Sequence, residues 1–146
     1  GYHKDLWEQT QKLSGVSDLG VVSESELEAL ARRADVLVNP RPISSHHSCM
    51  NFPSKLLDYL SYGRPIVSTR AVGLGPCYDE GLVFSESDEP RHIAAAIDHV
   101  LGLDDADTAR AIGRAVALAE RLSPEAAGNA FASWLTSLSR RERKAS

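Results

Sequence analysis

A short apolar run, DVLVNP at residues 35–40, closes at a proline and does not alternate with polar residues. A continuous run of this length is typical of a strand whose two faces are both covered, as in a parallel sheet. Two further short runs, PIVST at 65–69 and LVF at 82–84, follow it. Helical patterns separate these runs, and the alternation of strand and helix predicts an α/β domain built on a parallel sheet.

The helical segments carry recognisable start and stop signals. Ser23 and Glu26 have the spacing of a capping box in front of a helix over 24–33. Its expected buried face consists of four apolar residues: Leu27, Leu30, Ala31 and Ala34. Other helices are expected at 2–13, 53–62, 90–101, 105–121 and 124–138. Gly63 and Gly102 end two of them, and Asp88 is expected to cap the helix that Pro90 starts.

Composition limits the class of protein. The 146 residues suit one ordinary domain, and a net charge of −4 argues weakly against a nucleic-acid partner. No apolar run approaches the roughly 18 to 20 residues that span a bilayer, and residues 1–10 show no signal-peptide pattern. Cys49 and Cys77 fit no CxxC or zinc spacing, which favours idle thiols in a reducing cytoplasm.

The stretch NFPSKLLDYLSYGRPIV, at 51–67, carries the candidate site. A proline costs nothing in a first helical turn, whose N–H groups lack partners within the helix and suit an anion. Ser54 adds a hydroxyl and Lys55 a charge at that end, while Asp58 follows one turn, about 6 Å, later. The leucines of the run, Leu56, Leu57 and Leu60, are expected to anchor the helix on the sheet.

Two interpretations of these side chains stay open on residue chemistry alone. A nucleoside diphosphate would place its pyrophosphate at the helix start and its ribose diol on Asp58. Alternatively, Lys55 and Asp58 form an ordinary surface ion pair, worth only a few tenths of a kcal/mol.

The sequence ADVLVNPRP…NFPSKLLDYLSYGRPIVST resembles the C-terminal half of family-4-type glycosyltransferases with the GT-B fold. Their pattern is E-x-F-G-x-x-x-x-E-A-x-A-x-G-x-P-V-V, and five residues are in register with it: Phe52, Asp58, Gly63, Pro65 and Val67. The similarity covers residues 19–102, and the FPSK form resembles a subgroup that builds surface and capsular polysaccharides. The resemblance implies a Rossmann-like sheet and retaining transfer of a sugar from a nucleotide sugar to a glycan or lipid-linked acceptor.

The resemblance also implies roles for individual residues. Asp58 would bind the donor ribose, Ser54 and Lys55 the diphosphate, and Arg41 would cover the nucleotide. It assigns the adjoining Asn51, Phe52 and Pro53 to the same donor site. No catalytic residue is identifiable in the chain, and the fold needs no metal or other cofactor.

Two departures from the family pattern bear on the function. Met50 stands where the family often has an acid that contacts the donor sugar. The family's first strand and its acceptor-binding N-terminal domain have no counterpart here. We therefore expect residues 1–139 to be a partial donor-binding domain, inactive when isolated, followed by a basic tail at 140–146. The alternative is a degenerate module, without catalysis, that keeps the fold for interaction or regulation.

Other features have plainer explanations. His46 and His47 lack further metal ligands at suitable spacing and fit a solvated loop. An apolar stripe is expected to be core: Phe131, Trp134, Leu135 and Leu138. The tail, RRERKAS, is typical of a solvated chain end of a cytoplasmic protein. The sharper alternative is a peripheral contact with anionic lipid at the inner face of the membrane.

Overall fold

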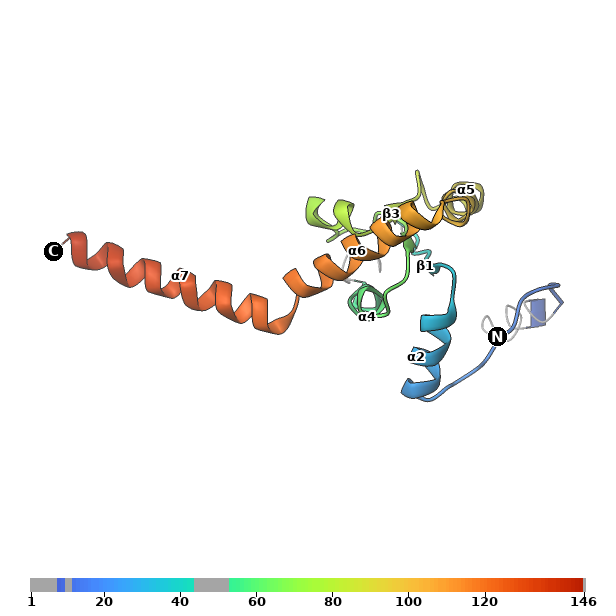
Figure 1. Cartoon of the computed structure of the whole chain (residues 1–146), viewed down its shortest axis with the longest axis horizontal. Helices are drawn as coiled ribbons and strands as arrows, with labels where there is room; N and C mark the ends of the chain where they lie inside the picture. The colour runs from blue at the N-terminus through green and yellow to red at the C-terminus, as the bar shows by residue number, and fades with distance from the viewer. Residues whose placement is uncertain (1–7, 10–11, 44–52, 146) are drawn as a thin grey trace. The chain divides into compact units, whose positions relative to one another are not determined.

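The computed structural model describes residues 8–9, 12–43 and 53–145, and residues 137–145 by their backbone alone (Figure 1). The chain separates into two compact units, Gly1–Leu30 and Ala31–Ser146. The helix expected at 2–13 lies largely outside the described residues. The second unit contains all three strands and the hydrophobic core.

Helix α2, Glu24–Arg33, begins with the predicted capping box. The Glu26 N–H donates to the Ser23 hydroxyl, and the Glu26 carboxylate accepts from the Ser23 N–H and hydroxyl at 2.9 and 2.6 Å. These hydrogen bonds hold the pKa of Glu26 below its ordinary value. The predicted buried face is only partly confirmed. Leu27 and Leu30 are 48% and 41% exposed, because only the last turn, with Ala31, belongs to the unit that holds the core.

The sheet consists of three parallel strands in the order β1-β2-β3 within the described residues. They are β1 (Leu37–Asn39), β2 (Ile66–Ser68) and β3 (Val83–Phe84), each inside a run that the sequence predicted. In register, Asn39 lies opposite Ser68, and Ser68 lies opposite Phe84. All three strands therefore end at one edge, which we call the carboxyl edge.

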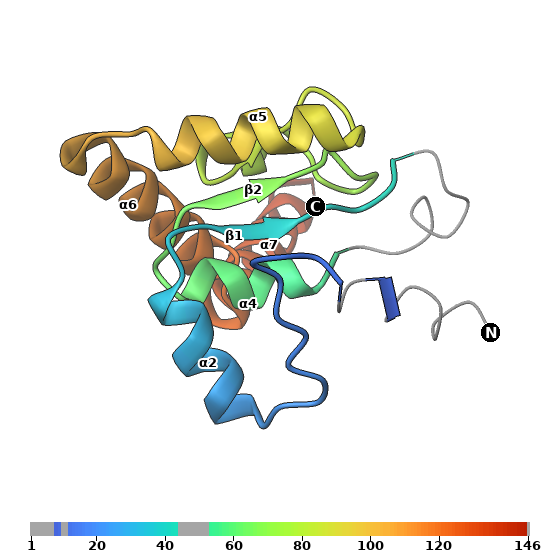
Figure 2. The ribbon, with the colours of Figure 1, turned by 90° about the vertical axis from the view of Figure 1, so that its right-hand side faces the viewer.

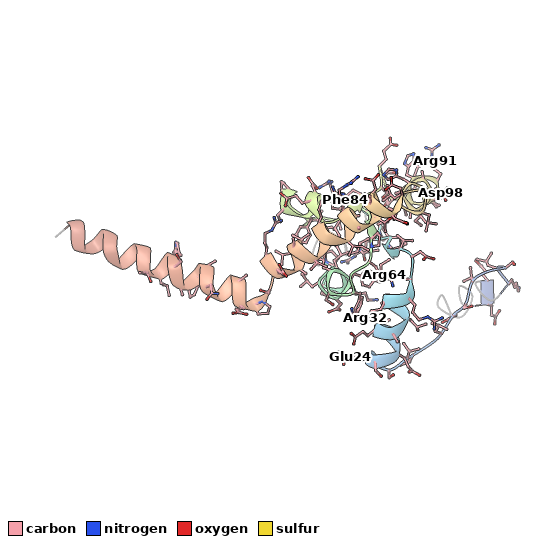
Figure 3. The ribbon with its side chains drawn as sticks, in the orientation of Figure 1. Glu24, Arg32, Arg64, Phe84, Arg91 and Asp98 are labelled. Carbon is pink, nitrogen blue, oxygen red and sulfur yellow. The ribbon has the colours of Figure 1, made fainter. Side chains whose placement is uncertain are left out.

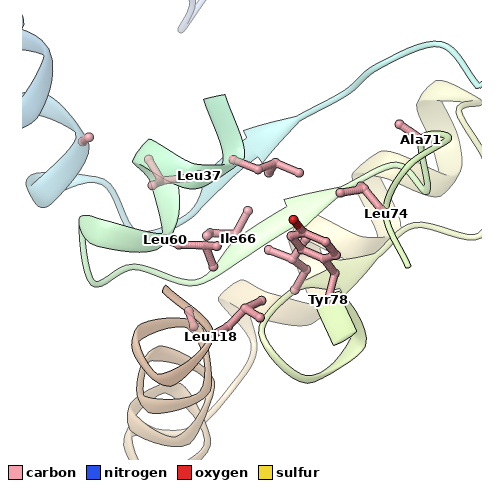
Figure 4. Packing of buried hydrophobic residues seen from close by; sticks show 11 residues of the cluster. Leu37, Leu60, Ile66, Ala71, Leu74, Tyr78 and Leu118 are labelled. Carbon is pink, nitrogen blue, oxygen red and sulfur yellow. The ribbon is translucent and has the colours of Figure 1, made fainter. Parts of the chain in front are cut away.

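Helices cover both faces of this sheet (Figure 2). Helix α4, Lys55–Ser61, lies on one face, and α5, Pro90–Leu101, on the other. Leu56 and Leu60 of α4 are fully buried and pack with strand residues and with Leu118 of α6, Asp105–Arg121 (Figure 4). This confirms the predicted fold class, a Rossmann-like α/β arrangement consistent with the C-terminal half of a GT-B fold. Leu57 departs from the prediction: it is 43% exposed, because it points away from the face that Leu56 and Leu60 bury.

The turn after α4 follows from one glycine. Gly63 has a φ of +66°, which an L side chain rarely adopts, and it ends the helix as predicted. The Arg64 guanidinium then donates to the carbonyl of Arg32, whose own guanidinium lies 6.0 Å from the centre of the Tyr62 ring (Figure 3). These contacts connect the end of α4 to the last turn of α2.

The segment between β2 and α6 differs from the prediction in two places. The glycine-rich stretch 73–81, for which no helix was predicted, contains a 3-10 helix, η1, at Pro76–Glu80. The N-cap of α5 is Glu89, without a side-chain capping bond, rather than Asp88. The Asp88 carboxylate instead accepts the N–H of Ile43 at 2.8 Å, so it serves a tertiary contact in place of a local one.

Helix α7, Pro124–Ala145, continues through the basic tail that the sequence left outside the helix. Arg, Glu, Lys and Ala are good helix formers, and no glycine or proline interrupts them. Its predicted core residues are instead exposed: Phe131 and Trp134 have 59% and 54% of their surface accessible. Their two rings stack on each other, with the ring centres 5.7 Å apart. Leu135 is 47% exposed, and the side chain of Leu138 is not described.

None of the helices in the described part of the chain is long and apolar enough to cross a membrane.

Candidate functional site

Buried polar side chains gather at the carboxyl edge of the sheet. Four polar residues are buried in the described part of the chain, and all lie where a strand ends: Asn39, Ser68, Thr69 and Ser85. Each follows or closes an apolar strand, and burial of a polar group requires a hydrogen-bond partner. In open α/β sheets, ligands bind beyond this edge.

These residues satisfy one another and the nearby backbone. The Asn39 side-chain amide donates to the Ser68 hydroxyl at 3.0 Å, and that hydroxyl donates to the Thr69 carbonyl at 2.9 Å. The Ser85 hydroxyl donates to the Ser87 carbonyl at 2.8 Å. The network has little flexibility because its members are buried and paired. It therefore acts as a fixed platform on which the loops after the strands are built.

The segment after β1 is attached to residues that follow the other two strands, β2 and β3. The Arg41 N–H donates to the Thr69 hydroxyl at 3.0 Å, and the same hydroxyl donates to the Arg41 carbonyl at 2.7 Å. Two residues later, the Ile43 N–H donates to Asp88, which follows β3. Arg41, a predicted site residue, is therefore held at the carboxyl edge by its own backbone.

The predicted residues of α4 lie at the start of that helix, which Figure 2 shows at the side of the sheet where β1 and β2 end. Pro53 is buried, whereas Ser54, Lys55 and Asp58 are exposed. Ser54 is the N-cap residue, and its side chain makes no capping hydrogen bond. The polar side chains at the start of α4 are therefore exposed, while Leu56 and Leu60 on the opposite face of the helix are fully buried.

The first turn of α4 offers fewer N–H donors than the sequence suggests. The N–H groups of Leu56 and Leu57 already donate to the carbonyls of Pro53 and Ser54, at 2.9 and 3.0 Å. The helix has seven residues, so its dipole is short. Anion binding at this end would therefore depend on the Ser54 hydroxyl, the Lys55 ammonium and the N–H groups of Ser54 and Lys55.

The alternative of a surface ion pair on α4 is not supported. Between the two described side chains Lys55 and Asp58, no salt bridge is formed, although Arg110 and Asp107 of α6 form one at the same i, i+3 spacing. Two predicted donor-site residues, Asn51 and Phe52, lie outside the described residues, as do Met50, His46 and His47. Among the residues that are described, no three His, Cys, Asp or Glu side chains are grouped to hold a metal ion.

Sequence reasoning missed the polar residues that end the strands. A usable signal was present, since LVN, PIVST and LVFS each pass from apolar to polar residues at the point where a parallel strand should end. It also missed Asp88 as a tertiary partner, because a local capping role explained that residue equally well.

A three-layered α/β unit with polar strand ends and a charged helix start at one edge defines a class of ligand-binding domains. A comparison with protein families gives the particular one. The model of the family described as glycosyl transferases group 1 matches residues 1–102, more than two thirds of the chain, and the chain belongs to this family. A comparison with curated proteins returned no match. Membership indicates a role in glycosyl transfer, with a nucleotide-sugar donor and an acceptor as substrates.

Proposed function

We propose that this chain is the donor-binding part of a retaining glycosyltransferase that uses a nucleoside-diphosphate sugar. The observation that carries the proposal is that one edge of the sheet holds the ends of the strands, Arg41 and the start of α4. Family membership supports the reaction class, and the edge supports the part of the substrate that binds here.

The diphosphate is assigned to the cationic side of the site. Lys55 and Ser54 stand at the start of α4, and Arg41, which follows β1, would cover the nucleotide. During transfer, the bond from the anomeric carbon to the diphosphate oxygen breaks and a bond to the acceptor oxygen forms. The diphosphate leaves with the electron pair, and the acceptor hydroxyl loses its proton. Fixed cations and donors stabilise the charge that develops on the leaving group, and no metal ion is required.

The ribose is assigned to Asp58. A carboxylate accepts hydrogen bonds from both hydroxyls of a diol, and Asp58 is exposed one turn after the cationic start of the same helix. Asn51, Phe52 and Pro53 complete the proposed donor site. The resemblance of the FPSK stretch to enzymes of polysaccharide synthesis favours a glycan or lipid-linked acceptor.

Nucleotide titration tests this assignment. We expect UDP or GDP to bind the chain, and Asp58→Ala to weaken binding by about 1 to 3 kcal/mol, because the ribose loses a charge-assisted hydrogen bond. Asp98→Ala, which removes an exposed aspartate from α5, is the matched control and should leave the affinity unchanged. Isothermal calorimetry provides the measurement.

The outcome separates the enzyme from its alternative. Failure of both nucleotides to bind, together with unchanged behaviour of Asp58→Ala toward nucleotide sugars, would favour the degenerate interaction module. Binding that depends on Asp58 and not on Asp98 supports the donor site.

A peripheral membrane contact belongs to the same proposal. Phe131 and Trp134 expose aromatic surface on α7, and four basic residues follow on the same helix: Arg140, Arg141, Arg143 and Lys144. Apolar residues next to basic ones suit an anionic lipid surface. Co-sedimentation with vesicles containing anionic lipid should exceed that with neutral vesicles, and equal recovery with both would remove this part of the proposal.

A further inference from the structure

The segment 41–43 is held from two sides by side chains that follow the other two strands. Thr69 follows β2 and is 1% exposed, and its hydroxyl both accepts from and donates to the backbone of Arg41. Asp88 follows β3, and its carboxylate accepts the N–H of Ile43. The contacts span 28 and 45 residues of sequence, so they fix where the chain leaves the sheet.

The Asp88 contact is specific rather than a by-product of helix capping. Its position before Pro90 suits an N-cap role, yet the N-cap is Glu89, and the Glu89 N–H donates to the Ser87 hydroxyl at 3.1 Å. The carboxylate of Asp88 is directed to Ile43 at 2.8 Å instead. An ionised acceptor makes a stronger hydrogen bond than a neutral one, and a partly buried one is screened less by water.

We propose that Thr69 and Asp88 are positioning residues for the donor site, acting through the segment that carries Arg41. This inference rests on the proposed function. The two side chains hold the backbone on either side of Pro42, at Arg41 and Ile43, so that the backbone of the segment carrying Arg41 needs no ordering when the nucleotide binds. Preorganisation of this kind raises affinity because less conformational freedom is lost on binding.

Conservative and disruptive substitutions separate positioning from a general structural role. Asp88→Ala removes the acceptor and should weaken UDP or GDP binding about tenfold, whereas Asp88→Asn keeps a carbonyl oxygen and should restore most of the affinity. Thr69→Val removes the hydroxyl at nearly constant shape, and Thr69→Ser keeps it. Ser87→Ala changes the same loop without touching segment 41–43 and should bind within about twofold of the unsubstituted chain.

A second readout does not depend on ligand. The Ile43 amide should exchange with solvent faster in Asp88→Ala than in the unsubstituted chain, while the Leu37 amide, which donates to the Pro65 carbonyl at 2.9 Å, should keep its protection. If Asp88→Ala does not fold, the Asp88→Asn and Thr69→Ser chains, compared with Thr69→Val, carry the same test.

The outcomes are distinct. Weakened binding in Asp88→Ala and Thr69→Val, with recovery in Asp88→Asn and Thr69→Ser, supports the inference. Equal affinity of all variants overturns it and leaves the donor site intact. Equal weakening in Asp88→Ala and Asp88→Asn also overturns it, since an acceptor oxygen at this position would then make no difference to binding. Failure of the unsubstituted chain to bind either nucleotide overturns the proposed function and this inference together.

Discussion

The phenol of Tyr78 sits in the hydrophobic cluster with 7% of its surface exposed. Burial raises its pKa, and the neighbouring Cys77 contributes a smaller increase. A buried phenol that stays neutral to a higher pH than its unfolded counterpart makes stability depend on pH.

We expect the free energy of unfolding to fall as pH rises past about 10, the pKa of tyrosine in an unfolded chain. Above that value the unfolded chain loses the Tyr78 proton while the folded chain retains it, so ionisation favours unfolding. Below it the contribution of Tyr78 is constant. Urea unfolding of the unsubstituted chain and of Tyr78→Phe at several alkaline pH values measures the effect. An identical alkaline loss in both would contradict the assignment.

The contacts and exposure of single residues were predictable where nearby residues in the sequence determine them. The Ser23–Glu26 capping box and the exposed polar face of α4 follow from spacing alone. The burial of Asn39 and Thr69 does not, because their hydrogen bonds join parts of the chain that are 28 or 29 residues apart in sequence. The sequence does not reveal Ile43 as the partner of Asp88 for the same reason, since 45 residues separate the two.

At the scale of elements, helix boundaries were predicted well where caps and breakers mark them. Helices α5 and α6 begin and end where the sequence indicated, since Pro90, Gly102 and Asp104 leave little freedom. Helix α7 shows the limit. Its apolar spacing identifies a stripe with Phe131 and Trp134, but periodicity does not reveal whether another element covers that stripe.

The contact between η1 and α6 depends on a glycine. A Cβ at Gly81 would lie 2.6 Å from Leu118 Cδ2 and 3.1 Å from Leu118 Cβ, and Leu118 is 1% exposed. We expect Gly81→Ala to lower the free energy of unfolding by about 1 to 3 kcal/mol, because the core side chain has no room to move. Chemical unfolding at neutral pH measures this.

Gly113, which lies on α6, provides the matched control for Gly81. A Cβ at Gly113 would meet nothing within 4 Å, and the position is helical and exposed. Gly113→Ala should therefore raise the free energy of unfolding by about 0.5 to 1 kcal/mol. If Gly81→Ala were as stable as the unsubstituted chain, the close packing of η1 on α6 would be wrong.

In the molecule as a whole, we propose that the donor binds at one edge of the sheet in the second unit, the carboxyl edge. The opposite edge offers a competing location, a cavity of about 370 Å³ whose lining includes Asp35, Arg64 and Thr108. Asp35 precedes β1 and Arg64 precedes β2, whereas a ligand of an open α/β sheet is expected at the opposite end of the strands. The two locations lie at opposite ends of the same sheet, so one experiment can compare them directly.

That experiment is a titration of the isotopically labelled chain with UDP and with GDP, followed through its backbone amide resonances. We predict that binding shifts the amides of Arg41, Lys55 and Thr69 and leaves those of Asp35, Arg64 and Thr108 in place. Shifts confined to the residues around the 370 Å³ cavity, or no shifts with either nucleotide, would contradict a donor site at the carboxyl edge.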